Sequence, residues 1–421
     1  MEHLLFATYL VLFAWLVTKT TFFANSGLSK AQLVMLFLIK VLMGIFYGWM
    51  GIYYDGYARM LDTWLHHQHG LEEYHLLTSD PLGYIQSFTH DPYESSQGVG
   101  KFFASYNSYW NDLKGVMFAK ILSIFDLFSF GEYYVNVIFY SFCSFFAPVA
   151  FFRVANDLFP GKRTTNIIAC FLVPSFVYWS SGIHKEGLLA VGIAIIVYHV
   201  YFGLKTNTWP VKRWLAFAIA FILLFTLRNF ILVVLLPALL VWVIASKLKR
   251  GQLLFFTGAY TLFIALFFGL RLISSSLDFP AVVVEKQKAF INSPGNTSID
   301  ITAMEATFSD FVKTAPQAIS FTTLRPFPSD ANHILSLAAV VEIVVIWLLL
   351  FLFILFPDIK NVNRPYLLFV LFFSITFLLA IGYSVNNLGA IVRYRSLIFP
   401  LFMVPILSGI NWQQLKTRLN I

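Results

Sequence analysis

The sequence predicts an all-α polytopic membrane protein, and three observations support this fold class. Of its 421 residues, 58% are hydrophobic and only 12% are charged, whereas about 25% are charged in a typical soluble protein. The mean hydropathy is +0.74, and 47 phenylalanines are spread along the whole chain. Apolar runs recur between short charged connections, and many are long enough to cross the roughly 30 Å hydrocarbon core of a bilayer.

We expect about eleven transmembrane helices in a single membrane domain, 1–421. The N-terminal run follows Glu2 rather than a basic segment, which favours a retained span over a cleaved signal peptide. Two long polar segments, 55–132 and 274–333, interrupt the spans, and the first is expected to contain an interfacial helix around 115–129. The expected spans lie near 4–18, 31–54, 133–155, 164–179, 187–204, 214–227, 230–246, 252–273, 334–356, 365–384 and 396–411.

The distribution of charge predicts the orientation of these spans. One set of short connections holds most of the lysines and arginines and only two acids, Asp157 and Asp358. The positive-inside rule then places the N-terminus and both long segments outside and the C-terminus inside. We therefore expect a multi-pass protein of the plasma (cytoplasmic or inner) membrane. The net charge of +8 reflects these connections and indicates no nucleic-acid partner.

Charged residues occur in two tight turns on the predicted outer side. The first turn, "SSGIHKEG", carries His184, Lys185 and Glu186, and the second, "LRNF", carries Arg228. His184 and Lys185 stand where a helix begins, and free backbone N–H groups at such a position favour a bound phosphate. Glu186 would orient Lys185 or act as a first-turn acid. The alternative is that these charges only keep the hairpin tips at the membrane surface.

Further charged residues lie at the outer boundaries of other spans. Arg393, Tyr394 and Arg395 precede the last span, and arginines at this spacing suit bidentate phosphate contacts. Arg325 ends the second long segment in "TTLRPFPSD". We expect the residues of these boundaries and of the two turns to hold a lipid-linked phosphate or pyrophosphate.

Two carboxylates stand where the second span emerges, in "YYDGYARMLD". Asp55, at the exit of that span, could act as a general base for an acceptor hydroxyl or amine. An ordinary helix-ending acid is the alternative.

The stretch "HHQHGLEEYH", residues 66–75, is dense in histidine and glutamate. It could bind an accessory metal, but it has no HExxH-type spacing, so a solvated polar loop is the favoured interpretation. The two cysteines match no metal-ligand spacing. We expect no metal site and no cofactor.

The residues quoted above resemble the GT-C class of integral-membrane glycosyltransferases, especially protein O-mannosyltransferases and lipid A aminoarabinose transferases. The resemblance rests on "YYDGYARM", "PSFVYWSSGIHKEGLLA" and "RYRSLIFPLF". It implies an inverting enzyme that moves a sugar from a polyprenyl-phosphate donor to a glycan, lipid or protein acceptor on the outer face. It also implies that the catalytic acid lies in the first large outer loop, here Asp55. The extra span before that loop departs from the family pattern. So does the single Asp, because many members carry an acidic pair, and Asp62 is the candidate for a supporting second acid.

Two other function classes remain open. A surface-polysaccharide polymerase or ligase would also be polytopic and use outer arginines to hold a pyrophosphate. A transporter or flippase for a lipid-linked glycan would place ionisable residues near the bilayer midplane. Lys40 and Glu342, two charges that lie well inside the expected spans, are the observation that favours transport.

Overall fold

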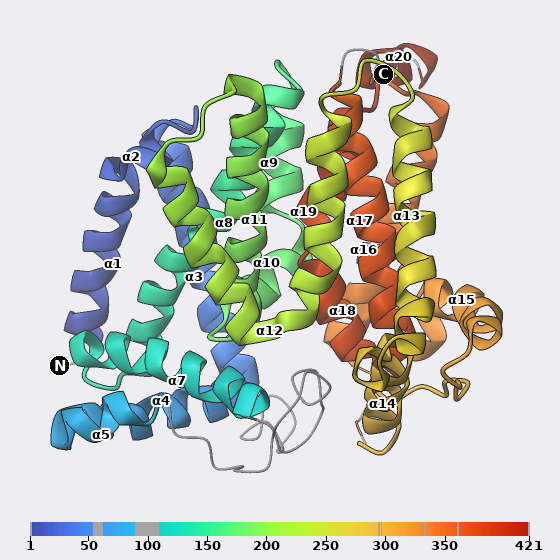
Figure 1. Cartoon of the computed structure of the whole chain (residues 1–421). Coiled ribbons are helices and arrows are strands. Elements are labelled where there is room, and N and C mark those ends of the chain that lie inside the picture. Colours follow the sequence, from blue (N-terminus) through green and yellow to red (C-terminus); the bar gives the residue numbers. More distant parts are fainter. Residues whose placement is uncertain are drawn as a thin grey trace. The chain divides into compact units, whose positions relative to one another are not determined.

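The computed structural model describes residues 2–53, 62–88, 109–293, 295, 297–331, 333–359 and 362–419. For residues 109–114 it describes the backbone alone. These residues form helices and turns, with two isolated bridges and no strand (Figure 1). Among them, eight helices are long and apolar enough to cross a membrane, or nine if one bent pair counts as a single span. The prediction of an all-α polytopic membrane protein is confirmed.

The chain, taken as one domain in the sequence analysis, divides into two compact units. Unit 1 is drawn from residues 1–95, 107–154 and 176–229. Its helices are α1 (Glu2–Lys19), α2 (Thr21–Ala24), α3 (Lys30–Tyr53), α4 (Asp62–Ser79), α5 (Pro81–Gln86), α7 (Tyr109–Ser129), most of α8 (Tyr133–Leu158), most of α10 (Pro174–Ser181), α11 (Lys185–Thr206) and the first part of α12 (Val211–Ala245).

Unit 2 is drawn from residues 155–175 and 230–421. In its core, Trp242 of α12 stacks on Phe369 of α17 with ring centroids 4.6 Å apart. It contains the ends of α8 and α12, the start of α10, and α9 (Arg163–Phe171), α13 (Gln252–Gly269), η2 (Leu270–Leu272), η3 (Ser275–Leu277), α14 (Phe279–Ile291), α15 (Phe308–Thr323), η4 (Pro328–Asp330), α16 (Ile334–Leu355), α17 (Arg364–Ser384), α18 (Leu388–Ser396), α19 (Phe399–Ser408) and α20 (Trp412–Leu419).

The structure differs from the expected eleven spans at three places. The expected span 164–179 is two short helices, α9 and α10, because Pro174 disfavours helical geometry in the residue before it and itself starts a new helix. The expected spans 214–227 and 230–246 form one helical element, α12, which is broken where Arg228 takes non-helical angles (φ −162°, ψ 84°). The expected span 396–411 is the ten-residue α19, bent by 66° from α18.

The two long polar segments are largely helical where the structure describes them. The first contains α4, α5 and α7, which run across one end of α3 and α8 in unit 1 (Figure 1). Lys120 on α7 is buried and ties this layer together, since it pairs with Glu73 Oε2 at 2.7 Å and donates to the Tyr84 carbonyl at 2.9 Å. The expectation of a solvated polar loop at 66–75 is wrong, because these residues lie within the helix α4.

Glycine allows α3 to approach the turn that follows α10. A Cβ on Gly44 would stand 2.6 Å from the Ser181 carbonyl oxygen and 2.6 Å from a Val137 methyl group. Neither contact can be relieved without moving backbone or a branched core side chain, and such overpacking typically costs about 1–3 kcal/mol.

Gly44→Ala is therefore expected to lower the thermal unfolding temperature of the purified protein in detergent. Gly258→Ala in α13 is the matched control, because a Cβ there meets nothing within 4 Å and alanine favours a helix over glycine by about 1 kcal/mol. Equal unfolding temperatures for the two variants would contradict the close packing of α3.

Candidate functional site

The turn between α10 and α11 is held by α3. The carbonyl groups at the end of α10 have no partner within the helix, and Lys40 supplies one. Its Nζ donates to the Ser180 carbonyl at 2.8 Å and to the Ser180 hydroxyl at 3.0 Å. A cation at a helix C-terminus also matches the helix dipole. At Gly182, a Cβ would lie 2.1 Å from the Tyr47 ring, so only glycine fits between the turn and α3.

The start of α11 is fixed from α8. His184 precedes the helix in an extended conformation (φ −153°, ψ 152°), and its carbonyl accepts a hydrogen bond from the Tyr140 hydroxyl. A Cβ on Gly187 would stand 2.3 Å from that hydroxyl and 2.6 Å from the Ser180 carbonyl oxygen. These contacts fix the position of the first turn of α11 relative to α8 and α10.

Helix α4 brings two ionisable side chains to this turn. Trp64 fixes the helix, because its Nε1 donates to the Gly48 carbonyl at 2.9 Å and its ring stacks on Tyr133 with centroids 3.9 Å apart. Asp62 and His66 are four residues apart and so share one face of α4. That face meets His184: the His66 and His184 rings lie 5.3 Å apart.

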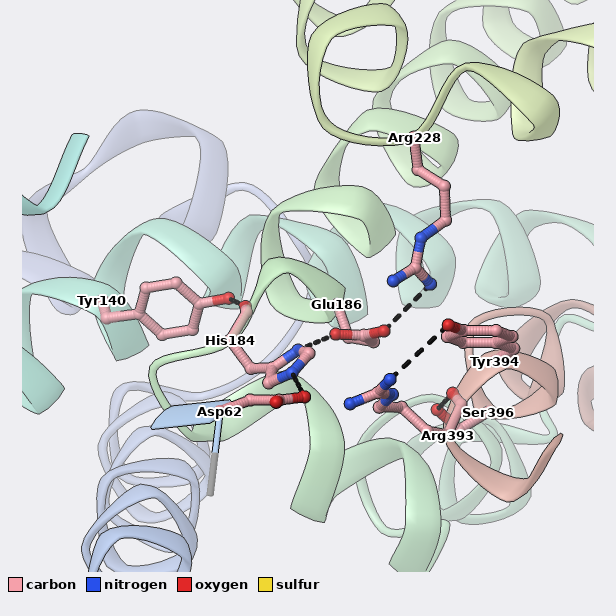
Figure 2. A network of polar contacts seen from close by, with 8 residues as sticks. All are labelled: Asp62, Tyr140, His184, Glu186, Arg228, Arg393, Tyr394 and Ser396. Atoms are coloured by element: carbon pink, nitrogen blue, oxygen red, sulfur yellow. Dashed lines mark hydrogen bonds and ion pairs between the residues drawn. The ribbon is translucent and has the colours of Figure 1, made fainter. Parts of the chain in front are cut away.

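Four side chains of unit 1 form a continuous polar network around this turn, which we call the Asp62–Arg228 network (Figure 2). His184 Nε2 lies 3.1 Å from Asp62 Oδ2, and His184 Nδ1 is hydrogen-bonded to Glu186 Oε2. Arg228 Nη1 donates to the other oxygen of Glu186 at 3.0 Å. The network thus joins α4, the start of α11 and the break in α12.

Burial increases along the network and then decreases. The side chain of Asp62 is 51% exposed, that of His184 3%, that of Glu186 0% and that of Arg228 15%. Ionised carboxylates only accept hydrogen bonds, so His184 can bond both of them only if both ring nitrogens carry protons or one carboxyl does. With both protons on the imidazole, the formal charges of the four groups cancel. Asp62 is the most exposed member of the network.

His66 is the neutral member of the site. Burial, followed by the nearby positive charges of His184 and Lys185, lowers the pKa of His66 to about 3. In the unfolded chain its pKa is near 6.5. The unfolded state therefore takes up a proton at higher pH than the folded state does, and this uptake favours unfolding as the pH falls.

The unfolding temperature is therefore expected to decrease as the pH is lowered from about 6.5 towards 3. His66→Gln should make this decrease shallower, because it removes the titrating group. His69→Gln, at an exposed position on the same helix, should leave the decrease unchanged. Thermal unfolding measured across this pH range tests the prediction, and an identical slope for wild type and His66→Gln would contradict it.

Within unit 1, the structure brings together four of the residues that the sequence analysis selected. Asp55 lies outside the described residues. His184, Glu186, Arg228 and Asp62 share one network, in which Glu186 contacts His184 and Arg228. Glu186 lies in the first turn of α11, which was one of the two roles expected for it. Lys185 lies in the first turn of α11 and is partly buried.

The remaining arginines belong to unit 2. Arg393 Nη2 lies 3.5 Å from the Tyr394 hydroxyl, and its guanidinium lies 5.2 Å from the centre of that ring (Figure 2). Arg395 is fully buried and donates to the Thr322 carbonyl at 3.1 Å. Its second acceptor is the Arg325 carbonyl at 2.5 Å, so Arg395 holds the end of α15 in place.

Sequence reasoning missed His66 and Tyr140. The composition of residues 66–75 favours a polar loop or a metal site, but the spacing of four residues between Asp62 and His66 is a signal for a shared helical face. Tyr140 lies within an aromatic-rich span, and nothing in its neighbourhood distinguishes it from core residues. Its role depends on the carbonyl of a residue 44 positions away.

Within the described residues, no group of three or more His, Cys, Asp or Glu side chains is arranged to hold a metal ion. His184 contacts two carboxylates, those of Asp62 and Glu186, through hydrogen bonds at its two ring nitrogens. Searches against protein-family models, curated proteins and solved structures find no match to this chain.

Proposed function

We propose that this protein is an inverting membrane glycosyltransferase that uses a polyprenyl-phosphate-linked sugar donor. The observation that supports this proposal is the Asp62–Arg228 network, in which a half-exposed carboxylate is oriented by a buried histidine and a buried ion pair. Such an arrangement suits a general base. The resemblance to GT-C enzymes supplies the substrate class.

In the proposed reaction, an acceptor hydroxyl or amine attacks the anomeric carbon of the donor sugar. Its proton passes to Asp62, and the bond between the anomeric carbon and the phosphate oxygen breaks with its electron pair remaining on the phosphate. Lys185 and Arg228 stabilise the negative charge that develops on the leaving phosphate. Asp55 remains the base that the resemblance implies, and Asp62 is the base that the network favours.

The environment of Lys40 and Glu342 supports a catalytic function over transport. Lys40 is 5% exposed and bonded to the end of α10. Glu342 is 6% exposed and accepts a hydrogen bond from the Ser175 amide at 2.7 Å. Both charges inside the spans therefore stabilise helix ends.

The direct test is sugar transfer by the purified protein in detergent, with synthetic polyprenyl-phosphate sugars and membrane extracts as the acceptor source. Transfer of label with release of polyprenyl phosphate is the expected result. Release of polyprenyl pyrophosphate and growth of the glycan by whole repeat units would instead identify a polymerase. Labelled substrate that crosses proteoliposome membranes without being cleaved would identify a transporter.

A further inference from the structure

A second group of charged residues lies at the other end of the helices of unit 1. Helices α8 and α11 both run away from the Asp62–Arg228 network, and the 22 residues of α11 extend about 33 Å, which is close to the thickness of a bilayer core. Near these far ends, Arg153 lies on α8 and Arg213 at the start of α12. The charge pattern places this end on the cytoplasmic side.

The two guanidinium groups converge on α11. That of Arg153 lies 4.9 Å from the centre of the Tyr198 ring, and both arginines are close enough to Tyr198 and His199 to interact electrostatically with them. One turn further along, Arg213 lies against Gly203, where a Cβ would be 3.0 Å from Arg213 Nη1. We call Arg153, His199 and Arg213 the far-end cluster.

Within the part of the chain that the structure describes, the far-end cluster has no negatively charged partner. Among the residues described here, no carboxylate forms an ion pair with Arg153 or Arg213. Arg153 donates to the Phe22 carbonyl at 3.5 Å, and Arg213 Nη2 to the Thr206 hydroxyl at 3.3 Å. Arg213 Nη1 and His199 Nδ1 are buried and have no hydrogen-bond partner among the described residues. Two neighbouring cations without a counterion repel each other, and buried donors without an acceptor are costly.

We propose that the far-end cluster binds the phosphate group of an anionic membrane lipid. A phosphate oxygen accepts from guanidinium groups in a fixed geometry, and a further oxygen can accept from His199 in the tautomer that is protonated at Nδ1. Basic residues between transmembrane helices on the cytoplasmic side are a recurring means of holding such headgroups. Trp209, whose ring packs over Gly203, adds the interfacial aromatic side chain typical of this depth.

The test is native mass spectrometry of the full-length protein in detergent, titrated with short-chain phosphatidylglycerol or with zwitterionic phosphatidylcholine of equal chain length. Wild type is expected to bind phosphatidylglycerol more tightly, and Arg213→Gln to weaken that binding about 5- to 10-fold, as the loss of one basic contact implies. Lys212→Gln is the control, because it removes the same charge from an exposed neighbour. It should leave the affinity within twofold of wild type, that is, within about 0.4 kcal/mol.

Gly203→Val provides a second variant that displaces Arg213 without changing the net charge, and it should also weaken phosphatidylglycerol binding. If Arg213→Gln unfolds at a lower temperature than wild type, its weaker binding could come from lost stability. The binding of phosphatidylglycerol by Gly203→Val then tests the proposal instead. Equal binding of the two lipids, or equal losses for Arg213→Gln and Lys212→Gln, would overturn the proposal. Inorganic phosphate that binds as tightly as phosphatidylglycerol, and in the same Arg213-dependent way, would assign the site to a free anion and overturn its assignment to a lipid.

Discussion

Asp62→Asn is expected to lower the rate of sugar transfer by about 10²–10⁴-fold, the usual contribution of a general base. Asparagine can still accept a hydrogen bond from His184, so the variant should keep its fold and its unfolding temperature. What it loses is the capacity to take up the acceptor proton.

Two further variants make this test specific. Glu72→Gln removes an exposed carboxylate from the same helix and should retain full activity. Asp55→Asn tests the base that the family resemblance implies. Full activity of Asp62→Asn together with a large loss in Asp55→Asn would show that the base is Asp55. The Asp62–Arg228 network would then only support the site.

Removing Glu186 is expected to cost the most stability of any single change at the site. Glu186→Leu leaves Arg228 and His184 beside an apolar group, and breaking a buried ion pair from one side typically costs about 3–5 kcal/mol. Arg228→Leu should cost a similar amount, because it leaves the fully buried Glu186 without its arginine. Thermal unfolding of each variant in detergent measures these losses.

The double variant Glu186→Leu/Arg228→Leu separates stability from function. Replacing both members of a buried ion pair with apolar side chains is often neutral or stabilising, so the double variant should recover most of the unfolding temperature. Sugar transfer should stay low, because His184 has lost the carboxylate that orients it. Recovery of both stability and activity would show that the ion pair has no part in the reaction.

The positions of the long spans could be predicted from the sequence because hydrophobicity alone decides them. The expected spans 31–54 and 365–384 correspond to α3 (Lys30–Tyr53) and α17 (Arg364–Ser384). The division at Pro174 was missed because the residues on both sides are apolar and the run has the length of a span. Helix α4 was missed because its buried face consists of Thr63, His67 and Gly70, which have helical spacing but little hydrophobicity.

The members of the site could be selected from the sequence, but not their pairing. His184, Glu186 and Arg228 were conspicuous because ionisable residues are costly near a bilayer. Arg228, which pairs with Glu186, lies 42 positions further along the chain. Asp62, which contacts His184, lies 122 positions before it. Such contacts depend on how α4, α11 and α12 pack, which local sequence does not encode.

The bond between Lys40 and the end of α10 has a consequence for biosynthesis. Lys40 and Ser180 are 140 residues apart in the sequence. At a translation rate of about 5–20 residues per second, Ser180 is therefore synthesised roughly 7–28 s after Lys40. If α3 enters the bilayer during that interval, we expect its lysine to lack this partner, and a lysine at a span centre costs about 2.5–3.5 kcal/mol. Chains truncated before Pro174 should therefore insert α3 less completely than full-length chains do, and Lys40→Leu should remove the difference.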